Sequence, residues 1–434
     1  MQSIKILVPI YTTPNVKSAI SMIIENLSSA LSQKVNVHIV WFVYSPDKLD
    51  VIPTINEGET ILDIHDFYNA IEVVQKEKPD IIYASPFWDP IDYAFSLAGK
   101  MTNIPVLDLT ISGYSFTRSK AKLIKSYLTR FFDSYVPTDT SKNKKQFMRR
   151  GRFFIYKHLF LLRTQRAINI SWFKVIQKFL MIMALYISNN KAIFDSRFAN
   201  TVHFLDSEIL LKAFHESGFE KSTLVVIGNP MYDEAFRKIS QMKDTRKGNQ
   251  IRVLFAPSTL YEHGFWTKNQ RDTAVRQIVK NILNYKNEIS LLVKIHPSSS
   301  VLTEYQSIIN SIDPTIPVYQ KGDIQDFLSN YDVLISFKFT TAEIYAVLAR
   351  KPVIICNFFN EESDMFVTKG LVNECKEPTR LVELIRKSFD FTPTYEKIRQ
   401  DFIQEFMYKW DGRAAERMAE KILTLLNTKH KPTN

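Results

Sequence analysis

Short apolar runs alternate with stretches of helical periodicity along most of this chain, and no other feature limits its fold as strongly. In the first part of the chain, apolar runs cover residues 4–10, 36–43, 80–85, 104–110, 201–207 and 222–230. Helical patterns lie near residues 16–32, 66–77 and 91–102. Runs that are apolar throughout indicate strands buried on both faces, as in parallel sheets. The alternation therefore predicts right-handed βαβ units and a doubly wound α/β sheet.

The alternation begins a second time after the polar stretch "KDTRKGNQ" (243–250), which we interpret as a linker. Strands are predicted at 251–256, 290–296, 316–319, 332–336 and 352–356, with helices near 270–285, 302–311, 324–330 and 341–350. A chain of 434 residues is too long for one ordinary core. We expect two Rossmann-like domains facing a cleft, residues 1–243 and 251–395, and C-terminal helices over 396–434 that pack back toward the first domain.

Two residue types are too scarce to support several common kinds of site. The 11 glycines form neither G-x-G-x-x-G nor G-x-x-x-x-G-K-[ST], so no glycine-rich phosphate loop is expected. Cys356 and Cys375 are the only cysteines, which excludes a disulfide framework and indicates a reducing, cytoplasmic compartment. Residues 1–15 match a strand and not a signal peptide. We predict no metal ion and no cofactor.

Hydroxyl and basic side chains follow three predicted strands of the second domain. They are Ser258, Thr259 and His263; His296 and Ser298; and Lys338, Thr340, Thr341 and Glu343. Ligands of open α/β sheets bind beyond the carboxyl ends of the strands. A helix that begins at Thr340 or Thr341 would also aim free N–H groups at a bound anion. This pattern predicts a site for a pyrophosphate group.

Each of these residues also has an interpretation without a ligand. His296 would simply end a strand in water, and Ser298 would cap the following helix. Thr340 and Glu343 have the spacing of a capping box, with the glutamate reaching back to the Thr340 N–H. The functional interpretation rests on the expectation that all three turns lie at one edge of one sheet.

Several stretches of the second half resemble a known family. "VLFAPSTLYEHG", "LVKIHP", "FKFTTAEIYAVLARKPVI" and "DGRAAERMAEKI" are similar to CDP-glycerol glycerophosphotransferases and related bacterial capsule and surface-polysaccharide glycosyltransferases, which have the GT-B fold. The resemblance covers roughly residues 220–425 and implies that His296 contacts the donor phosphates. It also implies that Thr340 and Thr341 replace a Ser-Ser pair of the family, and that Ser258 replaces a threonine.

The sequence departs from this family at two positions. Lys338 and Phe339 stand where the family has Asp-Tyr, and Tyr345 fills the slot of a ribose-binding glutamate in many GT-B relatives. A second resemblance lies in "VIGNPMYD" (226–233), which is similar to a stretch of the non-hydrolysing UDP-N-acetylglucosamine 2-epimerases. These departures leave the identity of the donor open.

Asp89 and Asp92 are the candidates for a general base, because both follow the predicted strand 80–85 at its carboxyl end. The loop 11–15 after the first strand should line the same site. The alternative for Asp92 is a place in the first turn of a helix, where a carboxylate suits the dipole. No Asp-x-Asp motif occurs, in keeping with a metal-independent mechanism.

Residues 118–191 hold 17 lysines and arginines against two acids, which makes this segment the source of the net charge of +11. Trp, Phe and Leu are interleaved with the cations, as in helices that lie on anionic membranes. Nucleic-acid binding and a solvated insertion are the two alternatives. We favour a basic helical insertion in the first domain that faces the membrane, and we predict no nucleic-acid partner.

The sequence thus predicts a GT-B glycosyltransferase that uses a nucleotide-sugar donor to extend a lipid-linked or surface glycan of capsule, lipopolysaccharide or teichoic-acid type. The expected location is cytoplasmic, peripheral at the inner face of the cell membrane. Three alternatives stay open: a transferase of the CDP-glycerol type with a CDP-alditol donor, a non-hydrolysing UDP-sugar 2-epimerase, and a catalytically degenerate GT-B binding protein.

Overall fold

The computed structural model describes most of the chain. The described residues are 3–11, 14, 18–49, 56–87, 89–111, 140–168, 171–188, 196–242, 250–262, 265–296, 302–338, 340–363 and 365–429, without the side chains of 140–151 and 182–188. They form two compact units: unit 1 comprises Met1–Asp233 and Glu405–Asn434, and unit 2 comprises Glu234–Gln404. The boundary between the units therefore lies at residues 233–234, before the predicted residue 243. Residues 396–404 belong to unit 2, whereas the sequence predicts that they return to the first domain. The expected linker lies almost wholly outside the described residues.

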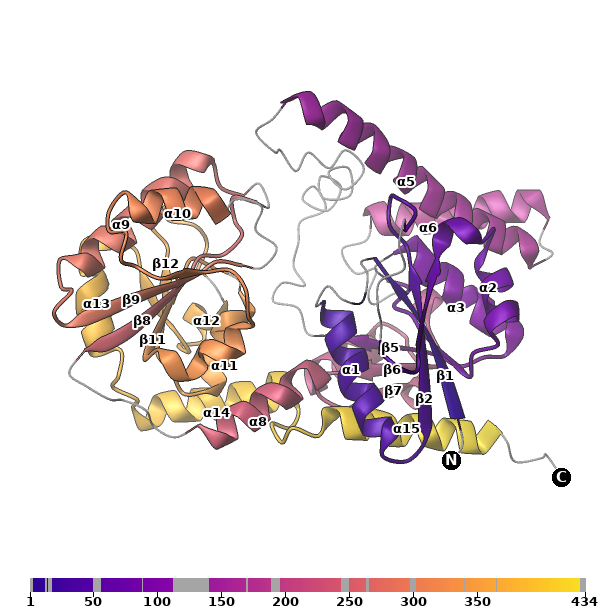
Figure 1. The fold of residues 1–434 in the computed structure, drawn as a ribbon. Helices are drawn as coiled ribbons and strands as arrows, with labels where there is room; N and C mark the ends of the chain where they lie inside the picture. The colour runs from indigo at the N-terminus through magenta and orange to yellow at the C-terminus, as the bar shows by residue number, and fades with distance from the viewer. Residues whose placement is uncertain are drawn as a thin grey trace. The chain divides into compact units, whose positions relative to one another are not determined.

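A parallel sheet of seven strands forms the centre of unit 1, in the order β3-β2-β1-β4-β5-β6-β7 (Figure 1). The strands are β1 (Ser3–Ile10), β2 (Asn36–Val43), β3 (Glu59–Asp63), β4 (Ile81–Tyr83), β5 (Val106–Thr110), β6 (Val202–Leu205) and β7 (Leu224–Val226). Strand β3 was not predicted from the sequence, because its five residues, ETILD, mix polar and apolar side chains. From β1 the next strands, β2 and β3, are added toward one edge of the sheet. From β4 the later strands, β5 to β7, are added toward the other edge, so the strand order reverses between β1 and β4.

Helices cover both faces of this sheet (Figure 1). The helices of unit 1 are α1 (Ala19–Ser32), α2 (Ala70–Glu77), α3 (Pro90–Thr102), α5 (Thr140–Ala167), α6 (Trp172–Ser188), α7 (Glu208–Glu216) and α15 (Ala414–Lys429). Alternate residues of β2 point to opposite faces: Phe42 packs with α2, α3 and α5, whereas Trp41 packs on the side of α1 and α15. Both faces are therefore apolar, as the uninterrupted strand pattern predicted.

Helix α5 is a packed part of unit 1 over its second half. Phe153, Phe160 and Leu161 are buried in the same apolar cluster as the strands. The hydroxyl of Thr164 accepts a hydrogen bond from the Ala70 N–H at the start of α2, at 3.1 Å. The segment that we predicted as a membrane-facing insertion thus contributes to the core in this part, because its apolar residues recur at helical spacing.

Unit 2 contains a second parallel sheet, of six strands in the order β10-β9-β8-β11-β12-β13. The strands are β8 (Ile251–Ala256), β9 (Ile289–Lys294), β10 (Val318–Tyr319), β11 (Val333–Ser336), β12 (Val353–Cys356) and β13 (Asn373–Cys375). The helices are α8 (Asp233–Gln241), α9 (Lys268–Leu283), α10 (Leu302–Asn310), α11 (Thr341–Leu348), α12 (Met365–Thr368), α13 (Leu381–Lys387) and α14 (Pro393–Met407). Residues Ile324–Asn330, predicted as a helix, form a 3₁₀ helix. The strand order reverses between β8 and β11.

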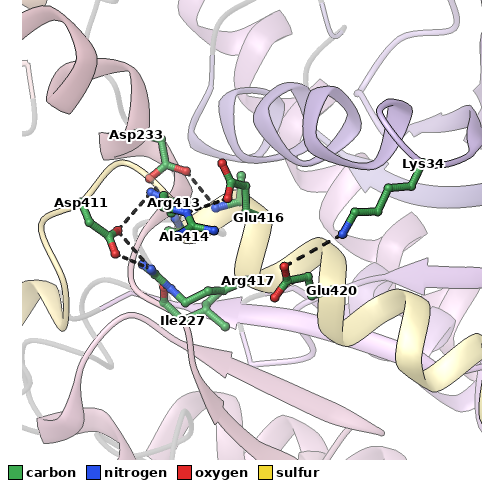
Figure 2. Close-up of polar contacts among 10 residues, drawn as sticks. Lys34, Ile227, Asp233, Asp411, Arg413, Ala414, Glu416, Arg417 and Glu420 are labelled. Carbon is green, nitrogen blue, oxygen red and sulfur yellow. Dashed lines mark hydrogen bonds and ion pairs between the residues drawn. The ribbon is translucent and has the colours of Figure 1, made fainter.

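The carboxylate of Asp233 joins the end of the chain to unit 1 (Figure 2). Its two oxygens accept hydrogen bonds from the N–H groups of Ala414, at 3.1 Å, and Ala415, at 2.8 Å, at the start of α15. A carboxylate in this position satisfies free N–H groups and suits the positive end of the helix. Because Asp233 itself is buried, these bonds are shielded from water.

Arg417 strengthens the same junction from the next turn of α15. Its guanidinium contacts both carboxylate oxygens of Asp411 and donates to the Ile227 carbonyl at 2.8 Å (Figure 2). Gly228 lies beside it with a φ of +84°, and a Cβ there would come within 3.3 Å of the Arg417 guanidinium and the Met407 carbonyl. The glycine of "VIGNP" is therefore required both by its backbone conformation and by the close approach of the tail.

We expect Asp233→Ala to lower the free energy of unfolding of unit 1 by about 2 kcal/mol, because the substitution removes a buried helix cap. Urea unfolding followed by circular dichroism measures this loss. Glu420→Ala is the control, since Glu420 lies exposed on the same helix, 3.9 Å from Lys34, and such pairs contribute less than about 1 kcal/mol. Equal losses in the two variants would contradict the capping role.

Candidate functional site

Three of the predicted site residues of unit 2 follow three adjacent strands. His296 follows β9, Ser258 follows β8 and Lys338 follows β11, and these strands are neighbours in the order β9-β8-β11. The Lys338 N–H donates a hydrogen bond to the Ser258 hydroxyl at 3.1 Å, which joins two of the turns directly. They meet where the strand order reverses, the place at which open α/β sheets bind ligands. We call this edge the unit-2 rim.

Helix α11 begins at the same rim. The hydroxyl of Thr340 accepts a hydrogen bond from the Ala342 N–H at 3.2 Å, so Thr340 is the N-cap. Thr341, at the first helical position, is exposed. The predicted helix start and its two hydroxyls therefore lie where the sequence pattern placed them.

Glu343 departs from both of its predicted roles. Its carboxylate is fully buried and accepts a hydrogen bond from the Ser336 hydroxyl at 2.6 Å, so it lies behind the rim. No capping box forms, because this side chain points toward β11 and not back toward the Thr340 N–H. Tyr345, in the slot of the ribose-binding glutamate, is buried as well.

The Lys338 ammonium donates a hydrogen bond to the Glu362 carbonyl in the loop after β12. Asn357 shapes that loop: its amide group donates to the Glu361 carbonyl and to the Glu374 carboxylate, both at 2.8 Å. Lys338 is thus half-buried and held in place, in contrast to the solvated lysine that we considered as an alternative. Its backbone lies two residues before Thr340, the N-cap of α11.

The remaining predicted residues of the rim divide into two groups. Thr259 is half-buried directly after Ser258, and His296 is exposed at the end of β9. His263 and Ser298 lie outside the described residues. Exposure of His296 agrees equally with a phosphate ligand and with a strand that ends in water.

A second cluster of polar side chains lies where the strand order of unit 1 reverses. Tyr11 follows β1, Tyr44 follows β2, and Ser85 follows β4. The Tyr44 hydroxyl donates to the Asp92 carboxylate at 3.4 Å, and the Ser85 N–H donates to the same carboxylate at 3.3 Å. We call Tyr11, Tyr44, Asp89 and Asp92, together with Lys157 described next, the unit-1 cluster.

Asp89 caps helix α3 through a hydrogen bond that its carboxylate accepts from the Ile91 N–H, at 2.9 Å. Its other oxygen contacts the ammonium of Lys157, from α5, at 2.6 Å. The structure therefore brings both predicted aspartates together. Tyr44 could have been found by the strand-end argument, because it directly follows an apolar run; Lys157 could not, because nothing distinguishes it from the other cations of residues 118–191.

The unit-1 cluster strongly perturbs the carboxyl group of Asp92. Burial raises the pKa of Asp92 well above its ordinary value, and the nearby Asp89 raises it further. The Ser85 N–H, the Tyr44 hydroxyl and Lys157 oppose this change. Burial also raises the pKa of Tyr44, with the Asp92 charge adding to the effect. A carboxyl group with a raised pKa is suited to proton transfer near neutral pH.

A buried polar network, not anticipated from the sequence, holds the cluster in place. Asp108 of β5 and His203 of β6 are paired across the two strands and fully buried, with 2.7 Å between carboxylate and imidazole. The Asn200 amide donates to Asp108 at 2.8 Å and to the Ala84 carbonyl at 2.9 Å. The Ser96 hydroxyl of α3 donates to Asn200 at 2.6 Å. This network fixes α3, which carries Asp89 and Asp92, to the end of β4.

Within the described ranges, no three His, Cys, Asp or Glu side chains gather as a metal ion would require. A search of the same residues finds no helix with the length and apolar character to cross a membrane.

The structure resembles solved structures over its whole length. It matches the S. aureus MnaA–UDP complex with a TM-score of 0.52 and 15% identity, over 100% of both chains. The UDP-GlcNAc 2-epimerase from Methanocaldococcus jannaschii matches with a TM-score of 0.53 and 14% identity, over 98% of this chain and 100% of that one. The enzyme from Neisseria meningitidis bound to UDP-GlcNAc matches with a TM-score of 0.52 and 14% identity, over 97% of this chain and 100% of that one.

The chain has the GT-B fold. This confirms the predicted fold class of two Rossmann-like α/β units. No family model matches the sequence, and no curated protein does. The likeness at 14–15% identity concerns the fold and leaves the reaction to be argued from the residues.

Asp92→Asn should raise the urea midpoint at pH 7–8, with no gain at about pH 4. A carboxyl whose pKa is raised in the folded state weakens folding once the pH exceeds its unfolded value of about 3.9, and most strongly above its folded value. Asp89→Asn should have the opposite effect at pH 7, because it removes the ion pair with Lys157 while the amide oxygen still caps α3. A loss of stability in Asp92→Asn at pH 8 would contradict this assignment.

Proposed function

We propose that the chain is an enzyme that breaks the bond between the anomeric carbon and the nucleoside diphosphate of a nucleotide sugar. The observation that carries this proposal is the unit-2 rim, where Ser258, Lys338 and the start of α11 meet at the reversal of the strand order. Hydroxyls, an ammonium group and the positive end of a helix stabilise the negative charge of a leaving diphosphate. UDP and UDP-GlcNAc are the ligands named for two of the similar structures.

The unit-1 cluster supports the proposal by offering proton transfer. Breaking the anomeric bond to a nucleotide is coupled to removal of a proton, either from an acceptor hydroxyl or from a carbon of the sugar itself. Asp92 with its raised pKa and the adjoining Tyr44 hydroxyl are suited to take that proton. General acid–base groups of this kind contribute about 10²–10⁴-fold to the rate.

Two outcomes of this bond cleavage are supported by different observations. The full-length similarity to UDP-GlcNAc 2-epimerases favours epimerisation, in which a proton leaves C2 of the sugar and returns to the opposite face. The sequence stretches similar to surface-polysaccharide and CDP-glycerol transferases favour transfer to an acceptor hydroxyl instead. Of the two, the structural comparisons give epimerisation the stronger support.

The test is incubation of the protein with UDP-GlcNAc in D2O, followed by proton NMR. An epimerase exchanges the C2 proton for deuterium and forms the C2 epimer without an acceptor. A transferase releases UDP from UDP-linked donors, or CMP from CMP- and CDP-linked donors, only when a glycan acceptor is added. If none of these donors binds or turns over, the proposed function is wrong and the chain is a binding protein with the GT-B fold.

Donor binding can be tested separately from turnover. Lys338→Met should weaken the affinity for UDP about tenfold in isothermal titration calorimetry, because it removes a charge-assisted contact to the diphosphate. Lys280→Met on the exposed side of α9 is the matched control and should bind UDP as the parent protein does.

We further propose that the acceptor, or the glycan that receives the product, is held at an anionic membrane surface. Helix α6 supports this, because Phe173 and Leu180 are 79% and 61% exposed and Trp172 and Ile176 accompany them. Residues 140–188 contain 11 lysines and arginines and no Asp or Glu, which complements anionic headgroups. Apolar side chains beside such an excess of cations are typical of interfacial helices.

Vesicles of phosphatidylglycerol should carry the protein upward in a flotation gradient, whereas vesicles of phosphatidylcholine should not. A Phe173→Asp, Leu180→Asp double variant should stay at the bottom, because charge on the apolar face opposes insertion. Phe265→Asp is the control, since Phe265 is 70% exposed but lies in unit 2. If the protein dimerises without lipid as its concentration rises, the apolar face of α6 binds a second copy of the chain. If the protein stays at the bottom with both vesicle types, another segment of this chain covers that face.

A further inference from the structure

Lys157 reaches the unit-1 cluster from α5. Its ammonium lies 2.6 Å from the Asp89 carboxylate, and both side chains are only 16% exposed. The same ammonium lies 6.0 Å from the centroid of the Tyr44 ring and 5.6 Å from that of Phe153. An ion pair enclosed in this way by aromatic rings is shielded from water and interacts more strongly than one on the surface.

The contacts of the two carboxylates differ in length and in the charge of the donor. Asp89 accepts from the Ile91 N–H at 2.9 Å and from the Lys157 ammonium at 2.6 Å. Asp92 is more deeply buried and accepts only long hydrogen bonds, from Tyr44 at 3.4 Å and from the Ser85 N–H at 3.3 Å. Because the shorter, charge-assisted contacts belong to Asp89, Asp92 is the carboxyl group that better holds a proton.

The groups that act on Asp92 come from four elements packed around it. Tyr44 follows β2, Tyr83 ends β4, Asp89 caps α3 and Lys157 projects from α5. Tyr11, about half exposed, packs edge-on against the Tyr44 ring at 5.8 Å between centroids and also contacts Phe153. His158 lies beyond this group: its Nδ1 is 2.7 Å from the Phe154 carbonyl, and burial lowers its pKa.

We propose that Lys157 is a positioning residue of the unit-1 cluster, which holds the Asp89 carboxylate in place at the cap of α3 and thereby leaves Asp92, together with the Tyr44 hydroxyl, to carry the exchangeable proton. In the forward direction the substrate proton passes to the Tyr44 oxygen while the Tyr44 proton passes to Asp92. After the product leaves, Asp92 returns a proton to the Tyr44 oxygen while the Tyr44 hydroxyl releases one to water, so charge and protons balance over one turnover. The use of this proton in catalysis rests on the proposed function.

This role predicts opposite effects for two substitutions. Lys157 lowers the pKa of Asp92 and Asp89 raises it, so Lys157→Met should raise the Asp92 pKa and Asp89→Asn should lower it. Lys157→Arg, which keeps the charge, should leave the Asp92 pKa close to that of the parent protein. Lys174→Met on α6 is the control, because Lys174 is exposed and outside the cluster.

The experiment is a carbon-13 NMR titration of protein labelled at the aspartate carboxyl carbons, with Asp92→Asn used to assign the signal. The midpoint of the Asp92 signal should move to higher pH in Lys157→Met and to lower pH in Asp89→Asn. The pH limb of kcat should move in the same directions, and kcat should fall about ten- to a hundredfold in Lys157→Met and recover in Lys157→Arg.

Three results separate the possibilities. Identical Asp92 midpoints in the parent protein, Lys157→Met and Lys157→Arg would overturn the role of Lys157. Shifted midpoints with no turnover of any nucleotide sugar would support that role and overturn the proposed function. Should Lys157→Met not fold, Asp89→Asn and Lys157→Arg still test the proposal, because a midpoint that does not fall in Asp89→Asn contradicts it.

Discussion

The buried carboxylate of Asp108 is the interaction on which unit 1 depends. It contacts His203 on the neighbouring strand and the Asn200 amide, which in turn binds the Ala84 carbonyl and Ser96 of α3. The His203 imidazole is neutral, because its Nε2 accepts a hydrogen bond from the Asn200 N–H at 2.8 Å. Loss of one donor to the buried Asp108 carboxyl group costs about 1–3 kcal/mol, because an acceptor is left without its partner in the core. The positions of Asp89 and Asp92 at the start of α3 follow from this one anchor.

In both sheets the polar side chains of the candidate sites lie where the strand order reverses, but the types of side chain differ. At the β8–β11 reversal the groups are hydroxyls, an ammonium and a helix start, which suit a fixed negative charge. At the β1–β4 reversal they are carboxyl and phenol groups with raised pKa values, which suit a mobile proton. The proposed function uses this division, because its leaving diphosphate is an anion and its substrate loses a proton.

The two basic helices, α5 and α6, place their apolar side chains differently. Helix α5 carries Lys157 into the unit-1 cluster and buries Phe153 and Phe160 in the core, whereas α6 leaves Phe173 and Leu180 exposed. In the sequence both helices combine cations with aromatic residues. Only the packing of α5 against α2 and α3 distinguishes a lysine that acts inside the protein from one that faces outward.

The sequence by itself determined the fold class, most strands, and the side chains that follow them, because apolar runs of strand length have few alternatives to a buried parallel sheet. It therefore predicted the Ser258, Lys338 and Thr340 turns and the two aspartates. It could not assign Glu343, since whether a glutamate faces a ligand or Ser336 depends on the rotation of α11 against β11. Only the tertiary structure decided the Lys157–Asp89 pair and the Asp108–His203 network, which join residues 68 and 95 positions apart in the chain, because local periodicity carries no information about contacts over such separations.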